Sequence, residues 1–240
     1  MRMKFTILAV TKMQERRICI AGINENGKWV RPVKDYPNHF KEVDLFDKDR
    51  LPIYKNFNIV EIDFTRKLEK HPHSEDYVIN ENKEPEVIGS FPLQKREEFL
   101  ISHTENDFFA NHEGEPVRKI LKEANRSLVL VGPVDVRYAV IEEGKTPRIR
   151  FNIPNVYDCE RSTPCTDLKF IAFCKVILKE RGNEKVILDS QELKRILEIE
   201  SIFLALGLGR WYKEKKDYYD MVIGFHTIPD YQTEIDYNNL

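Results

Sequence analysis

The first 34 residues fall into three short apolar segments that are separated by polar turns. Residues 4–11 and 16–24 are apolar runs rich in β-branched residues, which is typical of strands. Asn26-Gly27 follows, and this pair favours a two-residue hairpin turn because both turn positions need positive φ. Residues 28–33 then alternate large apolar with basic side chains. The pattern predicts three antiparallel strands at the start of the chain.

Beyond residue 34 the pattern predicts further strands and three helices. Strict period-two alternation over residues 57–64 indicates a strand. Pro92 and Pro116 stand at the starts of two expected helices, 92–102 and 115–125, since proline is tolerated at the first helical position. The remaining expected elements are strands at 127–132, 135–141, 148–153, 169–179 and 218–225, and a helix at 190–206 that ends before Gly207-Leu208-Gly209.

These elements form two β-rich blocks with a helical segment between them. We therefore expect a mainly β protein with helices (α+β), built from two small OB-like five-stranded barrels, since a Greek-key barrel of that strand count fits each block. The expected division is 1–90 for the N-terminal barrel, 91–126 for the helical connector, and 127–240 for the C-terminal barrel with its capping helix 190–206.

Composition and charge narrow the class of protein. The chain has 240 residues, of which 41% are hydrophobic and 32% charged, with no run near the ~18 apolar residues of a membrane span. Four cysteines are too few for a disulfide framework, and the N-terminus lacks a signal-peptide pattern, so we expect a cytoplasmic protein without membrane contact. The net charge of −2 is unevenly placed. Residues 1–34 carry eight Lys and Arg against two Asp and Glu, and residues 145–181 carry eight against four.

The N-terminal segments resemble a known family. Two segments are similar to the start of prokaryotic dual OB-fold domain proteins: Cys-Ile-Ala-Gly-Ile at 19–23 and, after it, Gly-Lys-Trp-Val-Arg-Pro-Val at 27–33. The loop 71–77 is similar to a His/Glu-Asp-aromatic motif of that family, and residues 203–207 and 218–225 are similar to its closing helix and strand. The resemblance implies two OB folds over nearly the whole chain and, by analogy of fold, nucleic-acid binding.

Basic and aromatic residues on the expected strands favour a nucleic-acid partner, single-stranded in preference to duplex, because such barrels bind phosphates with cations and bases with aromatic faces. Alternation places Trp29 and Arg31 on one strand face, and Arg148 and Arg150 on another. The alternative is that Trp29 lies in the core and the arginines are ordinary solvated strand residues. The expected binding residues are Arg17, Trp29, Arg31, Lys34, Arg148 and Arg150.

Two other functions remain open. A metal-dependent nuclease or hydrolase is the alternative, because imidazole with carboxylate can bind a divalent ion and activate water. The residues that suggest it lie within a six-residue segment: His71, His73, Glu75 and Asp76. A polar surface loop explains the same residues. A protein-interaction module is the third possibility. The chain has no phosphate-binding Gly-rich loop and no Gly-x-Ser-x-Gly motif, so we expect no cofactor and no catalytic residue of those types. The sequence leaves the oligomeric state open.

Overall fold

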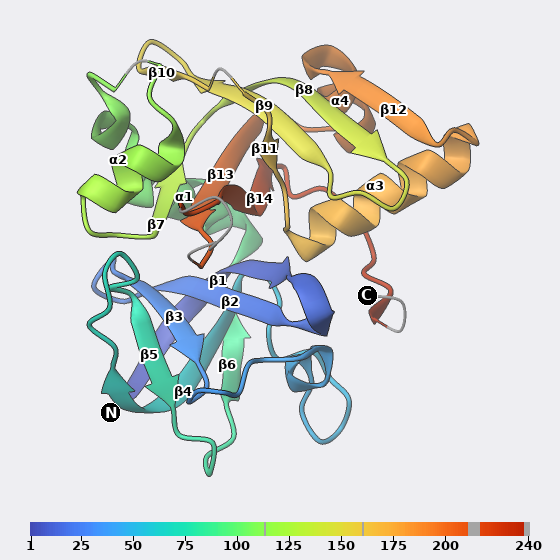
Figure 1. Ribbon diagram of the computed structural model, residues 1–240. Coiled ribbons are helices and arrows are strands. Elements are labelled where there is room, and N and C mark those ends of the chain that lie inside the picture. Colours follow the sequence, from blue (N-terminus) through green and yellow to red (C-terminus); the bar gives the residue numbers. More distant parts are fainter. Residues whose placement is uncertain (113, 160, 211–216, 238–240) are drawn as a thin grey trace.

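The computed structural model describes residues 1–112, 114–159, 161–210 and 217–237. The chain forms two stacked β-rich units, with helices α1 and α2 at one side of the contact between them (Figure 1). No helix among the described residues has the length and apolar content that a membrane span requires.

The first unit is a closed five-stranded barrel. Its hydrogen-bonded order is β1-β2-β3-β5-β4, and β4 pairs back onto β1. Strands β3 and β5 are parallel, whereas the other pairs are antiparallel. This order is that of the OB fold, a five-stranded Greek-key barrel. The strands are β1 (Arg2–Lys12), β2 (Ile18–Asn24), β3 (Trp29–Val33), β4 (Asn58–Lys67) and β5 (Asp76–Ile79), with β6 (Glu86–Ser90) added beside β4.

The second unit repeats the same path with longer connections. Strand β7 pairs with β13 and β13 with β14, while Val222 of β14 bridges in parallel to Cys165, which directly follows β11. Strand β11 pairs with β9, β9 with β8, and β8 follows β7 after a three-residue bend. With β7 and β8 taken as one bent first strand, the order is again that of an OB fold.

The strands of this unit are β7 (Leu128–Val131), β8 (Asp135–Glu142), β9 (Arg148–Ile153), β10 (Tyr157–Asp158), β11 (Thr163–Pro164), β12 (Lys185–Asp189), β13 (Ser201–Leu208) and β14 (Asp220–Ile228). Strand β12 extends the sheet beside β8. The helices are α1 (Arg96–His103) and α2 (Val117–Glu123) in the connection between the units, and α3 (Leu168–Arg181) and α4 (Ser190–Leu197) in the second unit. The fold class predicted from the sequence is confirmed.

The two barrels pack face to face through apolar side chains. Outward-facing residues of β1, β2 and β3 meet residues of β7, β13 and β14 in one buried cluster. The approach is close, because a Cβ added at Gly224 of β14 would lie 2.2 Å from the carbonyl oxygen of Leu8 in β1. The imidazole Nε2 of His226 donates to that same oxygen at 2.8 Å. The cluster includes Leu8, Ala21, Ile23, Trp29, Leu128, Leu130, Phe203, Ala205 and Ile223.

Two elements of the second barrel differ from the sequence prediction. Residues 169–179 form most of helix α3 and not a strand. Asp167 caps this helix by accepting from the backbone N–H of Phe170 at 2.7 Å, and the buried Phe170, Phe173 and Ile177 recur at helical spacing. An apolar run of this length does not by itself distinguish a buried strand from a buried helix.

The expected capping helix 190–206 is also wrong in its second half. Helix α4 ends at Leu197, because Glu198 adopts a left-handed conformation with φ of 54°. The chain then forms strand β13, which places Gly207 and Leu208 inside a strand and not after a helix. Strand β13 is buried on both faces, one toward the second core and one toward the first barrel, so its sequence shows no alternation.

Candidate nucleic-acid interface

The loop between β4 and β5 carries the residues considered as metal ligands, and the structure gives most of them protein partners. The Glu75 carboxylate accepts from the backbone N–H and hydroxyl of Ser127 at 2.8 and 3.0 Å and from the N–H of Leu128 at 3.2 Å. His71 contacts the side chain of Asn125. Within the described ranges, no group of three or more His, Cys, Asp or Glu side chains is arranged to hold a metal ion. The loop therefore fastens the first barrel to the start of the second.

His73 and Asp76 belong to a buried ionic network with Arg31. Arg31 Nε lies 2.5 Å from Asp76 Oδ1, and Arg210 Nη2 donates to Asp76 Oδ2 at 2.8 Å. Burial alone would lower the pKa of Arg31, but the Asp76 carboxylate, together with Cys19 and Glu75, more than offsets this and raises that pKa above its ordinary value. Burial, together with Arg31 and Arg210, lowers the pKa of His73 to about 2. His73 is therefore neutral, and its Nδ1 accepts from Arg31 Nη2 at 2.7 Å.

Trp29 and Arg31 share one face of β3, as alternation predicts, but the structure contradicts the expectation that this face is open. Their exposed fractions are 6% and 4%. Trp29 lies in the apolar cluster between the barrels, and Arg31 in the ionic network beside it. The outer surface of the second and third strands is where OB folds bind oligonucleotides, and in this barrel much of that surface is covered by the second barrel. A strand pattern shows that a face is apolar, but it does not show what covers it.

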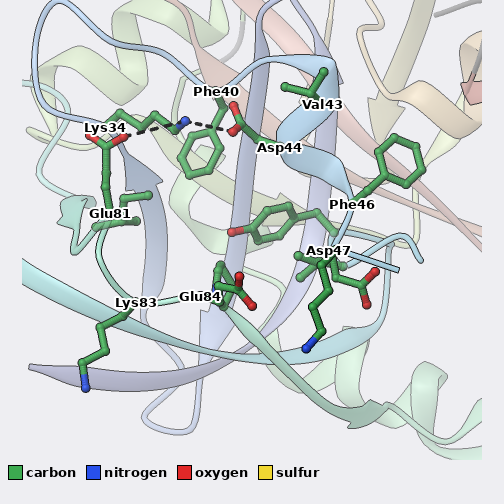
Figure 2. Close-up of a pocket in the computed structure, with 14 residues that line it drawn as sticks. Lys34, Phe40, Val43, Asp44, Phe46, Asp47, Glu81, Lys83 and Glu84 are labelled. Atoms are coloured by element: carbon green, nitrogen blue, oxygen red, sulfur yellow. Dashed lines mark hydrogen bonds and ion pairs between the residues drawn. The ribbon is translucent and has the colours of Figure 1, made fainter. Parts of the chain in front are cut away.

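Arg17 and Lys34 lie apart from this network. Arg17 pairs with Glu15 at the turn between β1 and β2. Lys34 Nζ donates to Asp44 at 2.9 Å and lies 3.8 Å from Glu81. Figure 2 marks both contacts with dashed lines. The pocket that these residues line has a volume of about 220 Å³. Lys34 is thus a half-buried, ion-paired residue, and the structure does not bring it together with the arginines of the second barrel.

Arg148 and Arg150 lie on the outward side of β9, opposite the buried Ile149, Phe151 and Ile153. Arg148 Nε donates to the hydroxyl of Ser162 at 3.0 Å, and Arg150 Nε donates to the carbonyl of Cys159 at 3.3 Å. Neither guanidinium has an ion-pair partner within 4.0 Å among the residues that the structure describes. Because Arg148 and Arg150 are two residues apart on one strand, their Cα atoms are separated by about 7 Å.

Strands β8 and β12 extend this outward face with aromatic and apolar side chains. The half-buried Tyr138 lies directly opposite Arg150, and Val140 opposite Arg148. Across the next pair, Ile187 of β12 lies opposite Val140 and is 57% exposed. Directly opposite residues on one face are about 5 Å apart, so a ring and a guanidinium lie side by side there. We call this surface, made of Tyr138, Val140, Arg148, Arg150 and Ile187, the β8–β9 face.

A comparison with family models gives this architecture a name. A model described as the dual OB-containing domain matches residues 3–225. The chain belongs to the dual OB-containing domain family. The resemblance noted at the N-terminal hairpin is therefore confirmed over most of the chain. OB-fold domains commonly bind nucleic acids. No curated protein sequence matches the chain.

The sequence patterns do not point to two residues that lie near the expected sites. Arg210 completes the network around Asp76, and its sequence signal is the basic and aromatic run of residues 210–219, of which 211–216 lie outside the described residues. Tyr138 is found only once the register of β8 against β9 is known, because a bulge between Val136 and Tyr138 shifts the alternation.

Proposed function

We propose that this dual OB protein binds nucleic acid through the β8–β9 face of its second barrel and carries out no reaction on it. OB folds bind oligonucleotides across the outer side of their second and third strands, between the loops that join strands 1 and 2 and strands 4 and 5. In the second barrel β9 is the second strand, and Arg148 reaches Ser162 beside the third.

The observation that carries the proposal is the contrast between the two barrels. In the first barrel Trp29 and Arg31 are covered by the partner barrel, and Arg31 is neutralised by Asp76. In the second barrel Arg148 and Arg150 face outward with hydroxyl and carbonyl partners, so their charge is available to phosphates. Tyr138 beside Arg150 offers a ring on which a base can stack. A face with flat and cationic groups favours single strands, whose bases are free to stack.

The contacts of the loop 71–76 do not support the nuclease alternative. The carboxylates of Glu75 and Asp76 are occupied by backbone donors and by two arginines, and both side chains are at least 92% buried. We infer that this loop joins the barrels and does not bind a divalent cation.

A salt titration of binding tests the proposal. Fluorescently labelled single strands of DNA and RNA, and a duplex, are titrated with protein at 50–300 mM salt, with and without Mg²⁺, and cleavage is scored in the same samples. For single strands the logarithm of the binding constant falls with the logarithm of salt with a slope of about −0.7 per phosphate contact. Arg148→Ala with Arg150→Ala removes two contacts, so the slope becomes shallower by about 1.4.

A charge-matched control separates the site from overall charge. Lys179→Ala with Arg195→Ala removes two exposed cations from α3 and α4 of the same barrel and leaves the slope at the wild-type value. Equal slopes for the two double variants contradict the assignment of the site. Absence of salt-sensitive binding of the wild-type protein to every probe contradicts the function itself, and cleavage that requires Mg²⁺ supports the nuclease alternative.

A further inference from the structure

We infer that a groove on the first barrel, separate from the β8–β9 face, binds a nucleotide, either free or as the phosphorylated end of a strand. The groove lies where the β2–β3 turn, the β4–β5 loop and the C-terminal ends of α1 and α2 meet, and its volume is about 590 Å³. That volume is within the range of small-molecule sites and far exceeds what a single phosphate needs. The site does not rest on the proposed function, because it uses none of the residues of the β8–β9 face.

Two lysines give the groove its charge. Lys28, at the β2–β3 turn, and Lys67, at the end of β4, have no ion-pair partner within 4.0 Å among the residues that the structure describes. Lys67 Nζ lies over the ring of Tyr77, 5.6 Å from its centre, which holds the ammonium beside an aromatic face. Both ammonium groups are free to contact a phosphate.

The carboxylates of the groove are hydrogen-bonded within the protein. Glu75 accepts three hydrogen bonds from Ser127 and Leu128, and Glu105 receives both terminal guanidinium nitrogens of Arg126, at 2.6 and 2.7 Å. Two carbonyls near the helix ends are also occupied. The Ile101 oxygen accepts from Thr104, and the backbone oxygen of Asn125, just beyond α2, accepts from Ser74. The lining thus holds Lys28, Lys67 and Arg126 against the two carboxylates, which leaves a net charge of +1.

An unpartnered donor and an acceptor belong to residues that line the groove. Trp29 lines the groove, and its buried Nε1–H has no hydrogen-bond partner among the described residues. A buried donor without an acceptor is unfavourable, and a ligand acceptor relieves this cost. Across the groove, Nδ1 of His103 lies 2.7 Å from the carbonyl oxygen of Phe99, which only accepts, so Nδ1 carries the proton and Nε2 is the acceptor.

This combination fits a nucleotide better than a bare anion. A phosphate uses the ammonium groups of Lys28 and Lys67, while an aromatic base offers an acceptor for the indole N–H and a donor for the imidazole nitrogen. Inorganic phosphate has no use for the indole donor and the imidazole acceptor together.

Tryptophan fluorescence measures occupation of the groove directly. The chain has two tryptophans, so Trp211→Phe leaves Trp29 as the sole reporter. In this background the four ribonucleoside 5′-monophosphates, a 5′-phosphorylated tetranucleotide, the same tetranucleotide with a 5′-hydroxyl, and inorganic phosphate are titrated. We expect saturable quenching by at least one monophosphate or by the phosphorylated tetranucleotide, and at least tenfold weaker binding of the 5′-hydroxyl form. Quenching by monophosphates identifies a free nucleotide, and quenching by the phosphorylated tetranucleotide alone identifies a strand end.

Variants of the two lysines decide whether the groove is the site. Lys28→Ala with Lys67→Ala weakens quenching at least tenfold. The charge-matched control, Lys83→Ala with Lys95→Ala, removes two exposed cations elsewhere on the first half of the chain and leaves quenching unchanged. No quenching by any nucleotide, quenching only by inorganic phosphate, or equal behaviour of the two double variants overturns the inference. Because Arg148→Ala with Arg150→Ala leaves the groove intact, this variant should lose oligonucleotide binding and keep the quenching. Retained oligonucleotide binding contradicts the proposed function alone, and lost quenching contradicts the groove inference alone.

Discussion

Replacing Asp76 with asparagine separates the charge of the buried network from its shape. The side chain of Asp76 is 1% exposed, and that of Arg31, 2.5 Å away, is 5% exposed. Asparagine keeps the size and one acceptor oxygen but leaves the guanidinium of Arg31 without a counter-charge in a place that water does not reach. Removing one partner of a buried ion pair costs about 3–5 kcal/mol. Arg210, whose side chain is 55% exposed, regains water when it loses Asp76, so we expect the lower end, about 3 kcal/mol.

Thermal and urea unfolding followed by circular dichroism measure this cost. For a protein of this size each kcal/mol shifts the midpoint by about 2–4 °C, so Asp76→Asn lowers Tm by roughly 6–12 °C. The control is Asp35→Asn, which breaks the pair with Arg66 whose side chains are 52% and 54% exposed. An exposed pair of this kind contributes little to stability, so Asp35→Asn should leave Tm close to the wild-type value.

A second variant tests the reason for the loss. Arg31→Met with Asp76→Leu removes both charges, so neither is left buried without the other, and recovers part of the stability lost in Asp76→Asn. A Tm for Asp76→Asn that equals that of Asp35→Asn would refute the argument, since it would mean that Arg31 reaches water or another anion when Asp76 is neutral.

Two further predictions concern the contact between the barrels. Burial raises the pKa of Asp167 to about 6. The folded protein therefore binds a proton more readily than the unfolded chain between pH ~4 and ~6, and ionisation of Asp167 above that range disfavours folding. In urea unfolding, Asp167→Asn should gain about 2 kcal/mol of stability relative to wild type between pH 4 and pH 8, and a pH-independent difference contradicts the burial argument. Gly224→Ala should destabilise the protein by about 2 kcal/mol or more in the same assay, because its Cβ meets the Leu8 carbonyl oxygen at 2.2 Å. At Gly209 the nearest atom is the flexible end of Met221 at 3.0 Å, so alanine should be tolerated there. Equal effects of the two substitutions would show that the barrels separate easily.

Local patterns predicted the first barrel well, because each of its signals is short-range. The turn at Asn26-Gly27 needs positive φ, and Gly27 has a φ of 71°. The alternation at 57–64 also survives in β4, with Val60, Ile62 and Phe64 buried. These features depend on neighbours within a few residues, so the sequence contains them directly.

The errors arise where burial on two sides removes the pattern. Residues 201–208 face the second core on one side and the first barrel on the other, so the apolar run has no period. For the same reason the sequence pattern did not show what surrounds Trp29 and Arg31. Their shared face was predictable, but the partner that covers it comes from residues 128–130 and 203–205, about a hundred residues or more away in the chain. Arg148 and Arg150 escaped this error because their strand has solvent on its outer side.

The covered face of the first barrel also determines how the molecule can be dissected. A fragment that stops near residue 90 would keep all five strands of that barrel but present Leu8, Ala21, Ile23 and Trp29 to water, together with a carboxylate at Glu75 stripped of its three donors. Such a piece would self-associate or adhere to other apolar surfaces, and any oligonucleotide retention it displayed would report stickiness and not recognition. Studies of either half are therefore best made by point substitution within the intact chain.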